Sequence, residues 1–138
     1  MFAKKPEKPQ SQIDSLIGAG IYIDGNIHFS GGLRIDGRVT GNITASGDKP
    51  STLVLSDQAT VQGVIEVSHV VINGSVVGEI KASEYVELQP RAKISGDINY
   101  KSMEIQLGAS VHGMLIHMED VQSESKVVTL MPVAQVRD

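Results

Sequence analysis

Four histidines are the side chains in this sequence best suited to acid–base catalysis or metal binding: His28, His69, His112 and His117. No histidine has a carboxylate at a spacing typical of a catalytic triad. His112 and His117 lie five residues apart, but no third metal ligand converges on them. His28 and His117 each follow an isoleucine, so strand alternation predicts that they face solvent. We therefore predict no catalytic residue and no metal site.

Composition and missing motifs exclude further kinds of chemistry. The chain has no cysteine, which removes disulfide scaffolds, thiolate catalysis and cysteine-bound zinc. It contains no Gly-x4-Gly-Lys-[Ser/Thr] phosphate loop, so we expect neither a cofactor nor nucleotide-driven assembly. The formal net charge of −4 argues against a nucleic-acid partner. No stretch approaches the roughly 20 apolar residues that span a bilayer, and no secretory signal is recognisable, so we expect a cytoplasmic protein.

The core that this chain can build is aliphatic. Among its 138 residues, 14 are isoleucine and 16 are valine, whereas aromatic residues make up only 4%. Isoleucine and valine are β-branched and favour strands. The composition therefore predicts an all-β domain.

A Gly-x-[Ile/Val/Leu] element recurs six times along the chain, with its third residue at Ile27, Ile43, Ile65, Ile80, Ile98 and Leu115. The mean spacing is about 18 residues, which is a period typical of repeat proteins. The longest step contains residues 46–51, which we interpret as a loop insertion of about four residues. A second apolar element precedes the glycine in matching places, at residues 33–35, 53–55, 70–72, 86–88 and 103–105.

This repeat favours a β-solenoid over a stack of hairpins, because the strands are too short and the period too regular for hairpins. Each winding would hold three short strands, with alternate side chains pointing inward to form an aliphatic column. We predict about six windings and a rod roughly 30 Å long. We divide the chain into a flexible N-terminal tail (1–20), the solenoid (21–117) and a flexible C-terminal tail (118–138), because both tails lack the repeat.

The two ends of such a rod determine whether it remains a monomer or polymerises. Soluble solenoids carry polar caps, and no amphipathic helix is predicted at either end. Either the tails fold over the ends, or ends pair with ends. The tails are polar and contain proline, which favours polymerisation. We predict an interface made by the two terminal windings, namely Ile21, Ile23, Ile27, Phe29, Met103, Ile105, Val111, Leu115 and Ile116.

Over about residues 14–117 the repeat resembles that of the bactofilins, a bacterial family of polymer-forming cytoskeletal proteins. Residues 16–20 leading to 23–27 are similar to the opening of that family, and residues 33–43 to its most typical winding. The resemblance implies a right-handed parallel β-helix that assembles end to end, without nucleotide, into non-polar filaments. It also implies a scaffold at the inner face of the cytoplasmic membrane that localises cell-wall enzymes and influences cell shape.

The N-terminus resembles the short membrane-binding sequence of many bactofilins. Its residues Met1, Phe2, Lys4 and Lys5 combine an aromatic ring with basic charge. The ring would enter the lipid interface, while each lysine near an anionic surface contributes about 1 kcal/mol. A filament would display many copies of this weak contact.

A second class of protein also has windings of 18 residues. Acyltransferases with a left-handed β-helix form trimers and use a histidine as general base between subunits. Here the strict six-residue period stops after Val39. We keep a trimeric acyltransferase as the alternative, to be distinguished from a filament by electron microscopy.

Overall fold

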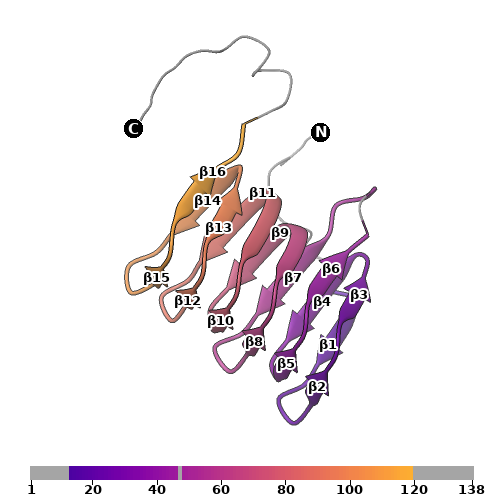
Figure 1. Cartoon of the computed structure of the whole chain (residues 1–138). Helices are drawn as coiled ribbons and strands as arrows, with labels where there is room; N and C mark the ends of the chain where they lie inside the picture. Colours follow the sequence, from indigo (N-terminus) through magenta and orange to yellow (C-terminus); the bar gives the residue numbers. More distant parts are fainter. Residues whose placement is uncertain (1–12, 47, 120–138) are drawn as a thin grey trace, which may run out of the picture.

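The computed structural model describes residues 13–46 and 48–119, and within them the chain forms sixteen short β-strands and no helix. The pairs between strands are parallel, and each joins a strand to its counterpart one repeat later, as where Leu33 lies opposite Ser15. Figure 1 shows the result, in which successive turns of the chain stack into one β-solenoid. The all-β solenoid expected from the repeat is confirmed.

Three strands make one winding, and the described residues contain six windings, as predicted. The strands stack into three faces. The first face consists of β1 (Ser15–Ile17), β4 (Gly32–Ile35), β7 (Thr52–Leu55), the second halves of β9 (Ile65–Ile72) and β11 (Ile80–Leu88), and β14 (Ser102–Ile105). The second face consists of β2 (Tyr22–Asp24), β5 (Arg38–Thr40), β8 (Thr60–Gln62), β10 (Ser75–Val77), β12 (Lys93–Ser95) and β15 (Ser110–His112). The third face consists of β3 (Ile27–Phe29), β6 (Ile43–Ala45), the first halves of β9 and β11, β13 (Ile98–Tyr100) and β16 (Leu115–His117).

Columns of aliphatic side chains fill the interior, because alternate residues of each strand point inward and every winding repeats the pattern. On the third face, the isoleucines of the Gly-x-apolar repeat stack directly on one another. Ile43, Ile65, Ile80 and Ile98 are all fully buried. The apolar triplets identified in the sequence align in the same way on the first face, where buried Leu53 lies opposite both Leu33 and Val70.

The glycine of each repeat forms the corner between the second and third faces. These glycines have φ between 143° and 158°, a conformation that other residues rarely adopt. A Cβ atom on Gly63 would collide with the carbonyl oxygen of Gly41 in the winding below. The glycine is therefore needed both for the turn and for the close stacking of windings.

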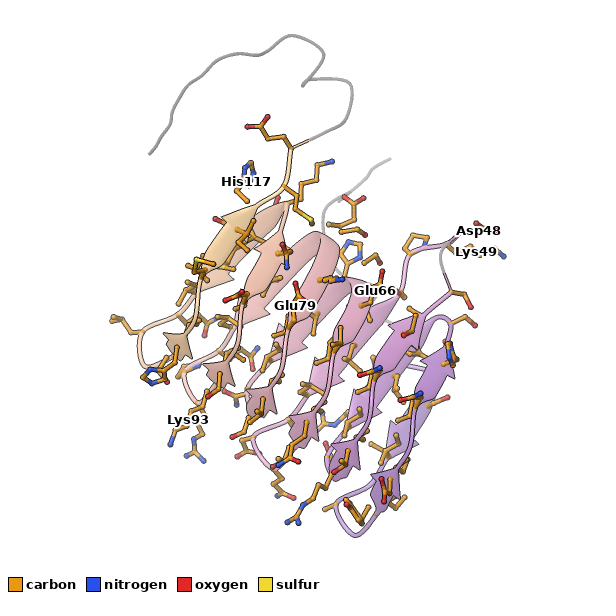
Figure 2. All side chains as sticks on the ribbon, in the orientation of Figure 1. Asp48, Lys49, Glu66, Glu79, Lys93 and His117 are labelled. Carbon is orange, nitrogen blue, oxygen red and sulfur yellow. The ribbon has the colours of Figure 1, made fainter. Side chains whose placement is uncertain are left out.

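The predicted loop insertion is confirmed by the register. β6 ends at Ala45 and β7 begins at Thr52, whereas the equivalent corner in β9 and β11 is crossed by a continuous strand. Figure 2 shows Asp48 and Lys49 of this loop projecting away from the stacked strands.

The N-terminal boundary of the solenoid differs from the prediction. Ser15–Ile17 lie in the segment that we expected to be tail, yet they form β1 and pair with residues 33–35 of β4. Ile17 packs against the core, so strand structure begins at residue 15 rather than 21. Most of the two expected tails, residues 1–12 and 120–138, lies outside the described residues. The right-handed sense of the helix stays a prediction of the family resemblance.

Candidate polymerisation interface

Among the residues that the structure describes, the rod has two open ends. β1, β2 and β3 pair only with the second winding, and β14, β15 and β16 pair only with the fifth. Inside the rod, backbone groups of neighbouring windings bond in both directions, as in Ile27 N to Asn42 O (2.8 Å) and Asp36 N to Ile17 O (2.7 Å). Each end winding therefore presents backbone donors and acceptors along one edge, which invites further strand pairing.

Exposed apolar side chains gather at these same ends. Ten large apolar side chains of the described residues are exposed. Nine of them lie in or beside the end windings: Ile13, Leu16, Ile21, Tyr22, Ile105, Leu107, Met114, Leu115 and Ile116. The tenth, Val77, lies on the side of the rod. Such clustering marks an interaction surface, whereas single exposed apolar residues are ordinary.

At the first end, the predicted interface residues extend the core columns. Ile23, Ile27 and Phe29 are half-buried and pack against the core, and Ile21 is 45% exposed. Sequence reasoning missed Ile17, which stacks on Ile35. The signal that could have found it was its spacing of 18 residues from Ile35.

At the last end, the predicted residues divide into two groups. Met103 and Val111 are half-buried against the core, while Ile105 and Leu115 occupy core positions and are 47% and 45% exposed because no winding covers them. Ile116 does not belong to this cross-section. It pairs with Asn99 in a row that points outward from the third face.

Two further apolar side chains at the last end lie in corners and were not among the predicted interface residues. Leu107 is 95% exposed between β14 and β15, and Met114 is 62% exposed just before β16. In the first, second and fifth windings, a side-chain oxygen at the position of Met114 accepts the N–H of the next winding. The Oδ1 atoms of Asn26, Asn42 and Asp97 accept the backbone N–H groups of Asn42, Val64 and Met114, respectively. Met114, like Val64 of the third winding, offers no such acceptor, so this corner of the last end is apolar.

The four histidines are separate from one another. His28 and His112 are exposed on β3 and β15, and His117 Nε2 lies 3.1 Å from the carbonyl oxygen of Lys101. His117 occupies a core position on the uncovered last winding, so its exposure comes from the rod end rather than from strand alternation. His69 Nδ1 lies 2.9 Å from Ser68 Oγ. Among the hydrogen bonds of the described residues, none gives a histidine a carboxylate partner.

A polar cluster on the first face joins the fifth and sixth windings. Tyr85 donates from its hydroxyl to Glu87 (3.1 Å) and Glu104 (3.2 Å), and Gln89 and Gln106 each donate to the other oxygen of Glu87 (3.2 Å). Burial raises the pKa of Tyr85 well above its usual value, and the two carboxylates raise it further. The tyrosine therefore keeps its proton and holds two like charges one winding apart.

The remaining expectations concern metals and membranes. In residues 13–46 and 48–119 no cluster of three metal-binding side chains occurs. The same residues contain no helix able to cross a membrane. The predicted membrane-binding residues Met1, Phe2, Lys4 and Lys5 lie outside the described part of the chain.

Within the described residues, the chain is a rod of stacked parallel strands whose apolar ends are covered by no further strand or helix, which is typical of self-associating β-solenoids. Residues 15–115 match the family model described as "Bactofilin: Polymer-forming cytoskeletal". The chain therefore belongs to the bactofilin family, which is cytoskeletal and not enzymatic. The trimeric acyltransferase is not favoured.

Two curated relatives come from Myxococcus xanthus (strain DK1622). The chain is similar to Bactofilin BacP, with 32% identity over 123 residues, covering 88% of this chain and 49% of the relative. It is also similar to Bactofilin BacO, with 36% identity over 100 residues, covering 72% of this chain and 76% of the relative. The chain thus spans about half the length of BacP. No solved structure matches it.

Proposed function

We propose that this chain polymerises end to end, without nucleotide, into non-polar filaments that act as a scaffold at the inner face of the cytoplasmic membrane. The observation that carries the proposal is the concentration of exposed apolar side chains at the two rod ends. The open strand edges at the same ends add backbone partners for a second rod.

The proposed contact combines apolar burial with strand pairing. Fully burying an aliphatic side chain contributes about 1.5–3 kcal/mol, so covering the exposed part of Ile105 (47%) or Leu115 (45%) contributes roughly half of that. In a non-polar filament, like ends meet across a two-fold axis, so strands run antiparallel across the junction although they run parallel within each rod. Both kinds of pairing satisfy the backbone groups at the edge.

The first experiment is negative-stain electron microscopy of the purified protein without nucleotide or metal. Wild-type protein should form filaments, and Ile105→Arg and Leu115→Arg should stop long filaments, because a buried unpaired charge is costly. Val77→Arg is the matched control, since Val77 is 51% exposed on the side of the rod. Circular dichroism checks that every variant keeps its β-structure. Long filaments in both end variants would show that the last end makes no contact.

The polarity of the filament is tested separately. The chain has no cysteine, so His112→Cys places a single thiol on the last winding. A short bifunctional thiol crosslinker should join filament subunits into dimers if like ends meet. In a head-to-tail filament the thiols would be separated by a rod length of about 30 Å, and subunits would stay uncrosslinked.

The membrane part of the proposal is supported by the sequence at residues 1–5, where one aromatic ring and two lysines lie together. Filaments should pellet with anionic liposomes, and deletion of residues 1–5 should reduce pelleting at least tenfold without changing filament length. Lys4→Gln/Lys5→Gln and Phe2→Ala separate the ionic from the apolar contribution. Unchanged pelleting of the deletion variant would contradict membrane binding through this segment.

The cellular part of the proposal is a scaffold, not an enzyme, that localises cell-wall enzymes and helps set cell shape. It is supported by membership of a polymer-forming cytoskeletal family. Replacing the native gene by the Leu115→Arg variant should disperse the protein from the cell edge and alter cell shape. Normal shape and localisation with a polymerisation-defective variant would contradict this role.

A further inference from the structure

The outward-facing residues of the first face form a row whose side chains change, from the second winding on, from basic to apolar to acidic along the rod. From the first winding to the sixth, the central outward positions are Leu16, Arg34, Val54, Val71, Glu87 and Glu104. Positive charge lies toward one end, two valines lie in the middle, and negative charge lies toward the other end. We propose that two rods pair side by side through this face, with their axes antiparallel.

The antiparallel arrangement follows from the register of the windings. A two-fold axis along the strand direction reverses the order of the windings in the second rod. The second winding of one rod then faces the fifth winding of the other, and the third faces the fourth. Arg34 then lies opposite Glu87, and Val54 lies opposite Val71. The parallel arrangement would place Arg34 opposite Arg34 and Glu87 opposite Glu87, which is unfavourable for like charges.

The flanking outward positions of the first face agree with the same symmetry. At one edge, Gly32, which is buried and donates its N–H to the Asp14 carboxylate (3.1 Å), lies opposite Tyr85. At the other edge, Asp36 lies opposite the amide of Gln89. At the margin of the interface Leu16 meets Glu104, and solvent reaches both.

The side chains of Glu87 and Arg34 are positioned for contact with a second rod. Glu87 accepts hydrogen bonds from Tyr85, Gln89 and Gln106, which hold its carboxylate on the face. Arg34 has one ion pair, Nε to Asp36 Oδ1 at 2.9 Å, and its side chain stays 47% exposed. Because a guanidinium has five donors, Arg34 keeps donors for a second carboxylate.

The other two faces fit a second copy less well. On the second face, the same symmetry would place Arg38 opposite Lys93, two like charges. The third face would bring Glu66 opposite Lys81, but it has no apolar centre there, and these residues line a recess of 620 Å³ beside the loop. Figure 2 shows Lys93 on the side of the rod away from Glu66.

The loop at residues 48–50 stands at the edge of the first face. A recess of 760 Å³ lies between this loop and the later windings of the same rod, and its lining includes Lys49 of the loop together with Glu84, Tyr85 and Lys101. The two-fold axis carries the loop of each rod toward the recess of the other, because the corner between the second and third windings lies opposite the corner between the fourth and fifth. Lys49 thereby approaches Glu84 of the second copy.

The paired surface is small for a single rod. Strands of three to four residues are about 12 Å long and six windings span about 29 Å, so one rod offers roughly 350 Å². A stable interface needs about 1,000 Å² in total. Pairing is therefore weak between isolated rods and stronger between filaments in which successive subunits turn this face to the same side, because their contacts add up.

The experiment measures filament width by electron microscopy at low salt. Wild-type filaments should run in pairs, and Arg34→Glu should give single filaments about half as wide. The double variant Arg34→Glu/Glu87→Arg should restore pairs, because it exchanges the charges without changing their complementarity. Val54→Lys, which puts a charge at the apolar centre, should also give single filaments. Lys93→Glu and Glu66→Lys make similar charge changes on the other faces and should leave the pairs intact.

Filament length is the readout that keeps lateral pairing distinct from the end contact. All these variants should form filaments as long as wild type, whereas loss of filaments would concern the proposed function. Single wild-type filaments, paired Arg34→Glu filaments, or a double variant that stays single would each overturn the lateral proposal. Thermal unfolding of each variant shows that the rod itself is unchanged.

Discussion

At the scale of single residues, the corner glycines contribute to stability in two separable ways. Gly25 and Gly63 share the same backbone conformation, with φ of 149° and 153°. A Cβ on Gly63 would meet the backbone of Gly41, whereas a Cβ on Gly25 would meet nothing, because no winding lies beneath it. The two positions therefore distinguish the strain of the turn from the steric need of stacking.

We predict that Gly63→Ala destabilises the rod more than Gly25→Ala does. Both substitutions carry the cost of an unfavourable φ, about 1–3 kcal/mol, and both reduce the entropy of the unfolded chain equally. Only Gly63→Ala adds a backbone collision, which should bring at least about 2 kcal/mol more. Urea unfolding of dilute rods in the Leu115→Arg background measures both. Equal losses would mean that stacking tolerates a methyl group.

The hydroxyl of Tyr85 makes stability depend on alkaline pH. Its pKa in the folded rod lies above the usual value of about 10, chiefly through burial and then through Glu87 and Glu104. Above pH 10 the unfolded chain loses this proton while the folded rod keeps it, so the folded rod binds more protons and its stability falls as pH rises. Below pH 10 the contribution is fully present.

We predict that Tyr85→Phe costs about 1 kcal/mol at neutral pH, because two carboxylates lose their shared donor. The same variant should show a smaller loss of stability between pH 9 and pH 11 (a range about one unit either side of the usual tyrosine pKa) than wild type does. Tyr22→Phe on the second face is the control, since its hydroxyl bonds Thr40 and no carboxylate. A wild-type pH profile in Tyr85→Phe would contradict the shifted pKa.

At the scale of elements, one winding is an exchangeable unit. Val71 and Glu87 occupy equivalent positions on the first face, so deleting residues 71–86 joins Val70 to Glu87 without changing inward and outward alternation. Leu88, Ile94 and Ile98 of the next winding then take the core columns of the deleted residues Ile72, Val76 and Ile80.

We predict that the 71–86 deletion folds as a rod of five windings, shorter by about 4.8 Å, and still polymerises because both ends are intact. Deletion of 71–87 is the control, since one further residue turns the following side chains to the wrong face. Circular dichroism and electron microscopy follow both. A folded 71–87 variant, or an unfolded 71–86 variant, would show that register is set elsewhere.

At the scale of the whole molecule, the ends and the sides of the rod differ in physical character. The end windings expose aliphatic side chains, whereas the proposed lateral contact on the first face relies on the charges of Arg34 and Glu87. Salt screens exposed charges, with a Debye length near 10 Å at 0.1 M and 3 Å at 1 M, but it does not weaken apolar burial.

We predict that raising sodium chloride from about 0.1 M to about 1 M separates paired filaments into single ones of unchanged length. Electron microscopy at both concentrations gives width and length together. Filaments that shorten with salt would show an ionic contribution at the rod ends. Filaments that stay paired would point to an apolar lateral contact centred on Val54 and Val71.

Much of this fold could be predicted from the sequence because a solenoid pairs each residue with its counterpart one period later. The Gly-x-apolar repeat located the corners, the isoleucine column and the inserted loop, and the register confirms each of them. The exposed end residues could be predicted from the same repeat, because no further winding covers the core side chains of a terminal winding. Strand alternation then separated inward from outward positions.

Which residues of neighbouring windings contact each other could be decided only from the tertiary structure, because the windings differ in length. β1 carries no Gly-x-apolar signal, and its pairing with β4 alone places Ile17 in the first winding. Tyr85 and Glu104 are 19 residues apart, yet they share a hydrogen bond because one winding separates them. Ile116 points outward although its neighbour Leu115 lies at the open end. Windings differ in length at their corners, so which outward residues share a row is a property of the stacked rod rather than of sequence spacing.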